Sequence, residues 1–267
     1  MLNLSISMGK RQLVDSIWTS AGIEGLGTTF PDTEKILSNI PVTTTRDEVL
    51  FIVNMKRAWY FLFDNITYPD NLMFLREVNK ICMNSLSYDA GNIRTVPVRI
   101  GGTTWNPGMP QEDTIIQKLD EIAQMSDRLE AALEMFCFVS RTQMFLDGNK
   151  RVAQLMCNKI LMQADLGIFL MPYEDIDTFK ELLVKFYESN DSSELKDFFR
   201  TKCLLRNLNT PTDISIESRV TKLLESIGHV ELLQEVKQVL PNKEYSDEGL
   251  RKNINAFLTV KGVPERV

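Results

Sequence analysis

The feature that most constrains this chain is a glycine turn between two long helical segments. The turn, residues 143–151, reads Gln-Met-Phe-Leu-Asp-Gly-Asn-Lys-Arg, and it separates helical periodicity at 127–144 from helical periodicity at 149–165. Glycine permits a backbone angle that other residues avoid, so one helix can follow the other closely. The second helix begins with unpaired backbone N–H groups and the positive end of its dipole. The sequence therefore predicts an anion-binding turn.

The side chains of the turn suit phosphate. Successive N–H groups of Gly148, Asn149 and Lys150 form an anion cradle in this interpretation. Lys150 and Arg151 add positive charge, and Asp147 is placed to hold Mg²⁺ against phosphate oxygens. The same residues also fit an ordinary turn with a solvated first helical turn. Basic residues there oppose the helix dipole, however, and so are poor choices for stability alone.

The composition excludes several functional classes. A net charge of −6 and a pI of about 5.1 argue against electrostatic binding of nucleic acid or anionic membranes. No apolar stretch approaches the roughly 18 residues that span a bilayer, and the N-terminus lacks the basic start of a signal peptide. We therefore expect a cytoplasmic protein. The four cysteines form no CxxC pair, which favours buried free thiols over disulfides or zinc.

Helical periodicity dominates the chain, which predicts a mainly α fold. We expect helices over these segments: 10–23, 45–65, 69–84, 112–125, 127–144, 149–165, 174–188 and 193–205. A polar linker is expected at 207–212, and short helices beyond it at 217–227 and 232–240. The predicted organisation is an N-terminal helix and linker (1–40), a core (41–206) and a small helical C-terminal region (207–267).

One segment has a β signal. Residues 93–100 alternate in type, Gly101-Gly102 turns the chain, and 103–105 returns, which predicts a small hairpin. Pro97 lacks an N–H donor, so this strand should be an edge or a free-standing flap.

The glycine turn resembles the signature of the Fic (Fic/Doc, or Fido) family, His-x-Phe-x-(Asp/Glu)-Gly-Asn-(Gly/Lys)-Arg. The matching residues are Phe145, Asp147, Gly148, Asn149, Lys150 and Arg151; Gln143 stands where the histidine is expected. Ser20-Ala-Gly-Ile-Glu24-Gly25 resembles the family's (Ser/Thr)-x-x-x-Glu-(Gly/Asn) inhibitory motif. Segment 91–103 is similar to the Fic flap, and the resemblance covers roughly residues 10–205.

The resemblance implies a helical Fic core that binds ATP and Mg²⁺ and transfers AMP to a Ser, Thr or Tyr hydroxyl of a target protein. In that reading Asp147 holds Mg²⁺, the turn from Gly148 to Lys150 holds phosphates, and Arg151 holds their β/γ end. Asn158 lies near the adenine. Ser20, Glu24 and Gly25 form the inhibitory motif. The flap residues that register the target as an added strand are Thr95, Val96, Val98 and Ile100.

Two positions depart from the family pattern. The histidine takes the proton of the attacking hydroxyl, and the amide of Gln143 cannot; losing a general base costs about 10²–10⁴-fold in rate. The chain's one histidine, His229, lies in the C-terminal region, where a capping or surface role is expected. Gln154 stands where many relatives have a second arginine, so Glu24 is left with Arg151, Lys150 or Gln154 as partners.

Three functions therefore remain open from the sequence. The first is an auto-inhibited AMP transferase of weak or altered activity. The second is a catalytically inactive nucleotide-binding regulatory module. The third is a Doc-like phosphotransferase, in which the nucleotide lies reversed and which the Lys150 variant of the signature suggests. The expected partners are the nucleotide and a target protein at the flap, and a homo-oligomer is left open.

Overall fold

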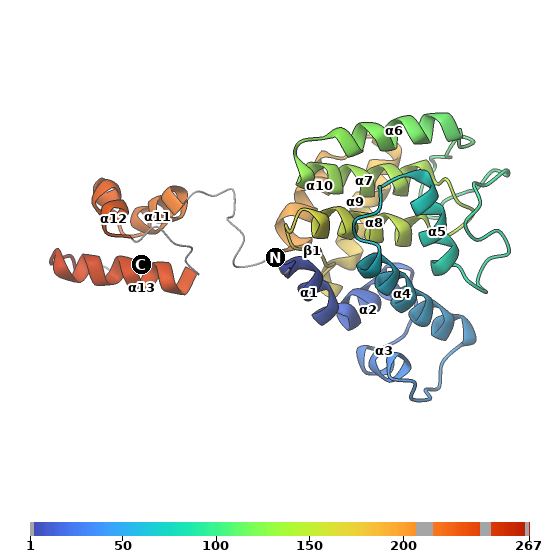
Figure 1. The fold of residues 1–267 in the computed structure, drawn as a ribbon, viewed down its shortest axis with the longest axis horizontal. Helices are drawn as coiled ribbons and strands as arrows, with labels where there is room; N and C mark the ends of the chain where they lie inside the picture. Colours follow the sequence, from blue (N-terminus) through green and yellow to red (C-terminus); the bar gives the residue numbers. More distant parts are fainter. Residues whose placement is uncertain (1–2, 207–215, 241–246, 265–266) are drawn as a thin grey trace. The chain divides into compact units, whose positions relative to one another are not determined.

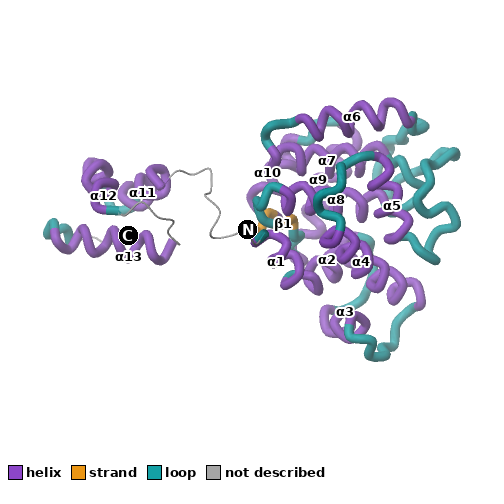
Figure 2. The backbone as a smooth tube through the Cα atoms, in the orientation of Figure 1, coloured by secondary structure: helices purple, strands orange, loops and turns teal. Residues whose placement is uncertain are grey.

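The computed structural model describes residues 3–206, 216–240, 247–264 and 267. The chain divides into two compact units, one ending at Arg206 and the other beginning at Asn207. The linker expected at 207–212 lies outside the described residues. As predicted, the described chain is mainly helical, with one two-stranded sheet (Figure 2).

The first unit contains ten α-helices among its described residues: α1 (Leu4–Arg11), α2 (Leu13–Ile23), α3 (Phe30–Leu37), α4 (Arg46–Asp64), α5 (Leu72–Cys82), α6 (Glu112–Gln124), α7 (Arg128–Thr142), α8 (Asn149–Gln163), α9 (Ile176–Ser189) and α10 (Ser193–Phe198). Short elements complete it: β1 (Ile168–Phe169), the 3-10 turn η1 (Tyr173–Asp175), the π-helical turn η2 (Phe199–Cys203) and β2 (Leu204–Leu205). The helices α1 and α3 were not predicted, because each spans only two turns and offers too few apolar repeats.

Helix α8 is the centre of the first unit (Figure 1). It packs against α7, α5 and α4, and all its residues except Lys150 and Gln163 are buried. The sequence pattern predicted one core-facing side. Since the whole helix is enclosed, its polar side chains must find partners inside the protein.

Lys159 is one of the polar side chains of α8 that have partners inside the protein. Its side chain is fully buried, and its Nζ donates to Tyr68 O and Asp70 Oδ1, both at 2.5 Å. Burial lowers the pKa of Lys159, and the Asp70 carboxylate opposes that change. This pair fixes α8 to the loop between α4 and α5, because breaking it would leave a buried charge without a counterion.

The N-terminal helix α2 is packed onto the core of the first unit. Trp18 stacks on Tyr173 with ring centroids 4.1 Å apart and meets Phe30 edge-on at 5.4 Å. Ile17 and Ala21 of the same helix have no exposed surface. The residues Ser20 to Glu24 at its C-terminal end are thereby held against α8.

The hairpin predicted at 93–105 is not formed. Ile93 makes an isolated antiparallel bridge with Phe145, and Arg94 N donates to Met144 O at 3.0 Å; residues 95–100 then run without a paired strand. Pro97 removes a donor, and an isolated two-stranded ribbon is only marginally stable.

The sheet lies elsewhere, in a place without a sequence signal. Strand β1 pairs antiparallel with β2, in the register Ile168 to Leu205 and Phe169 to Leu204. The last helix predicted for the core, 193–205, therefore ends at Phe198 and gives way to η2 and β2. A strand of two residues is too short to show an alternating pattern.

The second unit has its own small core. Its described elements are α11 (Ile216–Glu225), η3 (Val230–Leu232), α12 (Leu233–Val239) and α13 (Asp247–Val260). Val220, Leu224 and Ile254 are among the apolar side chains buried between them. His229 lies at the N-terminal cap of η3, with Nδ1 2.8 Å from Glu231 Oε1.

Two expectations from composition can be compared with the structure. The four cysteines are buried and free, as predicted, and burial raises the pKa of Cys82 to about 12. In the part of the chain that the structure describes, no helix has both the length and the apolar character needed to cross a bilayer.

Candidate functional site

The glycine turn is shaped by two residues in the left-handed region. Helix α7 ends at Gln143 with φ of 48°, and Gly148 precedes α8 with φ of 82°. A Cβ on Gly148 would lie 2.9 Å from both Asn79 Nδ2 and Met83 Sδ. Both the backbone angle and the close packing therefore require glycine.

Asn149 clamps the turn with its side chain. Its Oδ1 accepts from Phe145 N at 3.0 Å, and its Nδ2 donates to Phe145 O at 2.9 Å and to Gln143 Oε1 at 3.1 Å. Phe145 is fully buried beneath it. The side chain of Asn149 thus holds the loop in shape, and its predicted contact with nucleotide stays a prediction.

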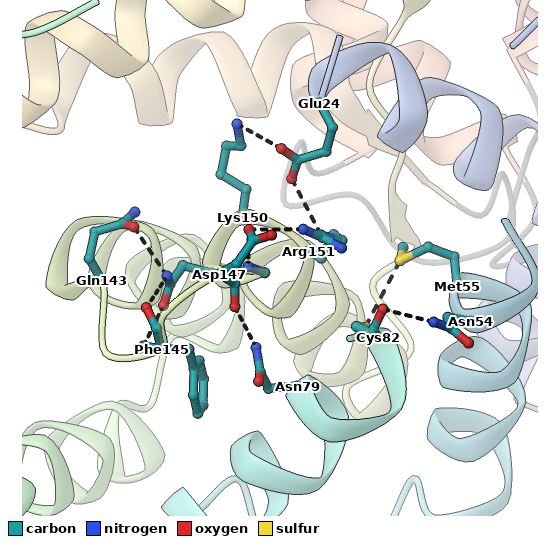
Figure 3. Close-up of polar contacts among 12 residues, drawn as sticks. Glu24, Asn54, Met55, Asn79, Cys82, Gln143, Phe145, Asp147, Lys150 and Arg151 are labelled. Atoms are coloured by element: carbon teal, nitrogen blue, oxygen red, sulfur yellow. Dashed lines mark hydrogen bonds and ion pairs between the residues drawn. The ribbon is translucent and has the colours of Figure 1, made fainter. Parts of the chain in front are cut away.

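A second amide, which the sequence did not single out, supports the turn from α5. Asn79 Nδ2 donates to Asp147 O at 2.9 Å (Figure 3). Asn79 Oδ1 accepts from Gly91 N at 2.8 Å. Asn79 is buried, and thus links the turn to the segment that leads into 95–108.

Asp147 and Arg151 face each other across the first turn of α8. Asp147 Oδ1 accepts from Gly148 N and lies 2.9 Å from Arg151 NH2, while the carboxylate remains largely exposed. Arg151 is buried and lies over the ring of Phe51 at 5.3 Å. Its Nε is buried without a hydrogen-bond acceptor. An unsatisfied buried donor is costly, so this atom is poised to bind an anion.

Glu24 is held by the cations of the turn. Its carboxylate lies 3.0 Å from Lys150 Nζ and 3.5 Å from Arg151 Nε (Figure 3). Ser20 Oγ donates to Gln154 Oε1 at 2.7 Å. Gly25 has φ of 78°, which ends the helix directly after Glu24. The structure thus brings the two segments singled out in the sequence, 20–25 and 143–151, into direct contact.

A cavity of about 490 Å³, the first cavity, opens at this contact. Glu24, Gln143, Asp147 and Lys150 line it. Of the predicted flap residues, Val98 and Ile100 line it as well, whereas Thr95 and Val96 are exposed and lie outside its wall.

Both polar atoms of the Gln143 side chain make hydrogen bonds within the protein. Its Nε2 donates to Ser140 O at 2.6 Å, and its Oε1 accepts from Asn149 Nδ2. Nearby, burial raises the pKa of Tyr187 far above its ordinary range, so that phenol stays protonated. The carboxylates that line the first cavity are Glu24 and Asp147.

Arg94 ties both ends of the loop 95–108 to the glycine turn. Its guanidinium donates to Gln143 O at 2.6 Å, to Val96 O at 2.8 Å and to Gly108 O. The side chain is 1% exposed. Burial lowers the pKa of Arg94, and the carbonyl groups around it replace the lost water. No sequence pattern marks this arginine.

Asn158 lies apart from the first cavity. Its Oδ1 accepts from Phe169 N at 2.8 Å, and its Nδ2 donates to Phe169 O and Gln154 O, both at 3.0 Å. The side chain therefore pairs with β1 as a second strand would. Contact with an adenine, predicted from the resemblance, stays a prediction.

The donor set fits a nucleotide phosphate with Mg²⁺. Arg151 Nε has no acceptor, Lys150 is half-buried at the cavity wall, and Gly148 leaves no space for a Cβ. Asp147 offers one exposed carboxylate, and the described residues contain no group of three potential metal ligands. One or two carboxylates together with phosphate oxygens are the usual Mg²⁺ environment in such sites.

Comparison with known proteins shows which protein family part of the chain matches. Residues 70–161, from the start of α5 through most of α8, match the model of the Fic/DOC family. No protein of curated function matches the chain in sequence.

Solved structures share the fold. Fic-1 from C. elegans is 17% identical over 95% of this chain and 66% of that one, with a TM-score of 0.59. A Fic domain containing signaling protein from Bacteroides thetaiotaomicron is 16% identical over 73% of this chain and 83% of that one (TM-score 0.61). A Fic family protein from Desulfovibrio desulfuricans is 16% identical over 94% of this chain and 78% of that one, with a TM-score of 0.57. The chain spans 63% and 66% of two Fic-1 structures.

Proposed function

Because residues 70–161 belong to the Fic/DOC family, we propose that this chain binds ATP with Mg²⁺ in the first cavity and transfers AMP to a hydroxyl of a target protein. Helix α2 restrains the reaction, and Gln143 slows it. The observation that carries the proposal is the buried Nε of Arg151 at the N-terminal end of α8, which ion-pairs with Glu24 at 3.5 Å but donates no hydrogen bond.

Each residue of the glycine turn has a role in holding the nucleotide. Lys150 and Arg151 bind phosphate oxygens, and the N–H groups at the start of α8 add to them. Asp147 holds Mg²⁺, which neutralises charge on the phosphates. Asn149 and Asn79 keep the turn in shape through hydrogen bonds to Phe145 and Asp147.

The transfer forms a bond from the target's hydroxyl oxygen to the α-phosphorus and breaks the bond from that phosphorus to pyrophosphate. The hydroxyl proton must leave, and an amide does not accept it. It passes to water, because Asp147 holds Mg²⁺ in this proposal. We expect turnover roughly 10²–10⁴-fold below that of a site with a histidine base.

Restraint follows from competition for the same cations. Glu24 contacts Lys150 and Arg151, the two charges that phosphate requires. A nucleotide that brings its phosphates to these residues must displace the Glu24 carboxylate. The hydrogen bond from Ser20 to Gln154 holds α2 in the blocking position.

One observation favours a second candidate, an inactive nucleotide-binding regulatory module. Both polar atoms of the Gln143 side chain are hydrogen-bonded to the end of α7 and to Asn149, so the residue has a role in holding the turn that needs no catalysis. A Doc-like phosphotransferase, in which the γ-phosphoryl group moves, rests on the lysine at position 150.

The experiment that tests these functions uses two labels. The wild-type protein, Glu24→Gly and Gln143→His are incubated with Mg²⁺ and ATP labelled at either the α- or the γ-phosphate, with and without a cell extract as the source of target. Protein-bound α-label in Glu24→Gly supports AMP transfer. Protein-bound γ-label supports phosphoryl transfer instead.

The matched control is Glu174→Gln, which removes one exposed carboxylate outside the first cavity. ATP binding without transfer in any variant, Gln143→His included, identifies the inactive module. Absence of ATP binding in both the wild-type protein and Glu24→Gly contradicts the whole proposal.

A further inference from the structure

A second cavity of about 500 Å³ adjoins the first, and their walls share no residue. Arg141 and Thr142 line the second cavity, while Gln143 lines the first. On α9, Phe186 lines the second cavity and Tyr187 lines the first. The end of α7 and one edge of α9 thus separate two neighbouring spaces.

The second cavity contains a cation without a counterion. Arg141 donates through Nε and NH2 to Tyr187 O, at 3.3 and 3.1 Å, and its guanidinium lies 4.4 Å from the centre of the Trp105 ring. Among the residues that the structure describes, no carboxylate forms an ion pair with it. Burial lowers the pKa of Arg141, so an incoming anion would recover lost solvation.

The other charges of this wall are already matched. Glu134 lies 3.1 Å from Lys118 and 2.6 Å from Lys196, so its charge is offset twice. Lys118 also pairs with Glu121 at 3.7 Å. Among the described residues of this wall, Arg141 is therefore the charge without an ion-pair partner, and a guanidinium can bind a carboxylate through two N–H groups.

The wall is held in place before any ligand arrives. Arg94, buried and hydrogen-bonded, donates to Gly108 O and lies 3.4 Å from Met109 Sδ. Gly108 and Met109 line the second cavity. Arg141 itself is fixed by its two bonds to Tyr187. A preformed wall lowers the entropy cost of binding.

The loop 95–108 runs along both cavities. Residues 98–102 line the first, and Trp105, Pro107 and Gly108 line the second. The loop has no partner strand, so its backbone can pair with an extended peptide. Such a peptide, with a hydroxyl in the first cavity, would place a nearby side chain in the second.

We propose that the second cavity is an accessory subsite for the target polypeptide and takes a Glu or Asp side chain close to the acceptor hydroxyl. Arg141 and Gln143 are two positions apart at the end of α7, so the side chain that enters the second cavity belongs to a residue close in sequence to the acceptor. The inference rests on the proposed function, because it assumes that the first cavity receives the target's hydroxyl.

Synthetic eleven-residue peptides with the acceptor residue at the centre test the subsite directly. Each contains one serine or tyrosine, with a glutamate placed at each position from one to five residues on either side, and a glutamine counterpart for each. Binding is measured by calorimetry at low salt. We expect one or two glutamate positions to bind about tenfold more tightly than glutamine, in line with one charge-assisted contact.

Variants test whether Arg141 causes the preference for glutamate. Arg141→Gln should remove it, Arg141→Lys should retain part of it, and Arg57→Gln, an exposed arginine on α4 outside both cavities, should leave it unchanged. Thermal unfolding confirms that each variant folds. A wild-type protein that binds both peptides equally, or a glutamate preference that persists in Arg141→Gln, overturns the inference without any need for transfer activity.

A parallel ATP titration separates this failure from failure of the proposed function. ATP binding with no glutamate preference refutes the subsite alone. A glutamate preference that depends on Arg141, in a protein that does not bind ATP, supports the acidic subsite and refutes nucleotide transfer.

Discussion

Glu24 Oε2 lies 3.0 Å from Lys150 Nζ, which joins the C-terminal end of α2 to the first turn of α8. The sequence left three partners open for Glu24. In the structure Lys150 and Arg151 form ion pairs with Glu24, while Gln154 accepts a hydrogen bond from Ser20. The contact is therefore made with cations of the glycine turn itself, so any ligand that needs them competes with Glu24.

Replacing Glu24 by glutamine should increase affinity for ATP-Mg²⁺. The amide keeps the size of the side chain but no longer competes as an anion, and we expect affinity to rise about tenfold, or about 1.4 kcal/mol. Calorimetric titration measures it. Glu174→Gln should bind as the wild-type protein does; equal gains in both variants would reflect overall charge instead.

Replacing Gln143 by histidine should raise transfer by about 10²–10⁴-fold if the pocket is otherwise intact. Histidine tolerates the left-handed backbone at this position, where φ is 48°. The gain should appear with a pH dependence near the histidine pKa, measured as initial rates from pH 5 to 8. Gln143→Asn, which lacks a base and also suits this backbone, should show no such gain.

Much of the glycine turn was predictable because its chemistry is local. A glycine between two helical repeats, followed by two basic residues, implies an N-terminal anion site wherever the helices pack. The structure gives Gly148 the expected left-handed backbone and places segment 20–25 against Lys150 and Arg151.

What could not be predicted depends on residues distant in sequence. Asn79 reaches Asp147 across 68 positions, and Arg94 reaches Gln143 across 49. The prediction of a hairpin was wrong for a related reason. Alternation in 93–100 indicates which side chains can face a core, but it does not indicate whether a partner strand exists. Asn158 accepts a hydrogen bond from the backbone N–H of Phe169 in β1. This bond is required because α8 is buried, which the local sequence does not show.

Replacing Gly148 by alanine should destabilise the first unit and weaken ATP binding. The left-handed backbone and the close approach of Asn79 and Met83 together should cost about 1–3 kcal/mol, measured by urea unfolding. Gly108→Ala is the matched control, because nothing lies within 4 Å of its Cβ position, its φ is ordinary, and it lies outside the wall of the first cavity. Equal losses in the two variants would contradict this account.

Replacing Arg94 by lysine should loosen the loop 95–108. A lysine cannot reach Gln143 O, Val96 O and Gly108 O together, and we expect a loss of about 3 kcal/mol or more because the buried charge loses partners. Trypsin cleavage after Arg99, in the middle of this loop, measures the loosening and should accelerate. Arg99→Lys, an exposed change that keeps the cleavage site, should match the wild-type rate.

Glu48 should make the stability of the first unit depend on acid pH. Hydrogen bonds from Thr44 and Thr45 lower the pKa of its carboxyl from 4.5 to about 2, and the same carboxylate caps α4 and accepts from Gly27 N. Because the folded pKa lies below the unfolded one, this stabilisation is complete above about pH 5 and is lost as the pH falls towards 2. Glu48→Gln should therefore be less stable than the wild-type protein at pH 7, and the difference should shrink on acidification. Thermal unfolding between pH 7 and 2 measures it, with Glu174→Gln expected to follow the wild-type curve; a gap between Glu48→Gln and wild type that stays constant with pH would rule out this role for the carboxylate.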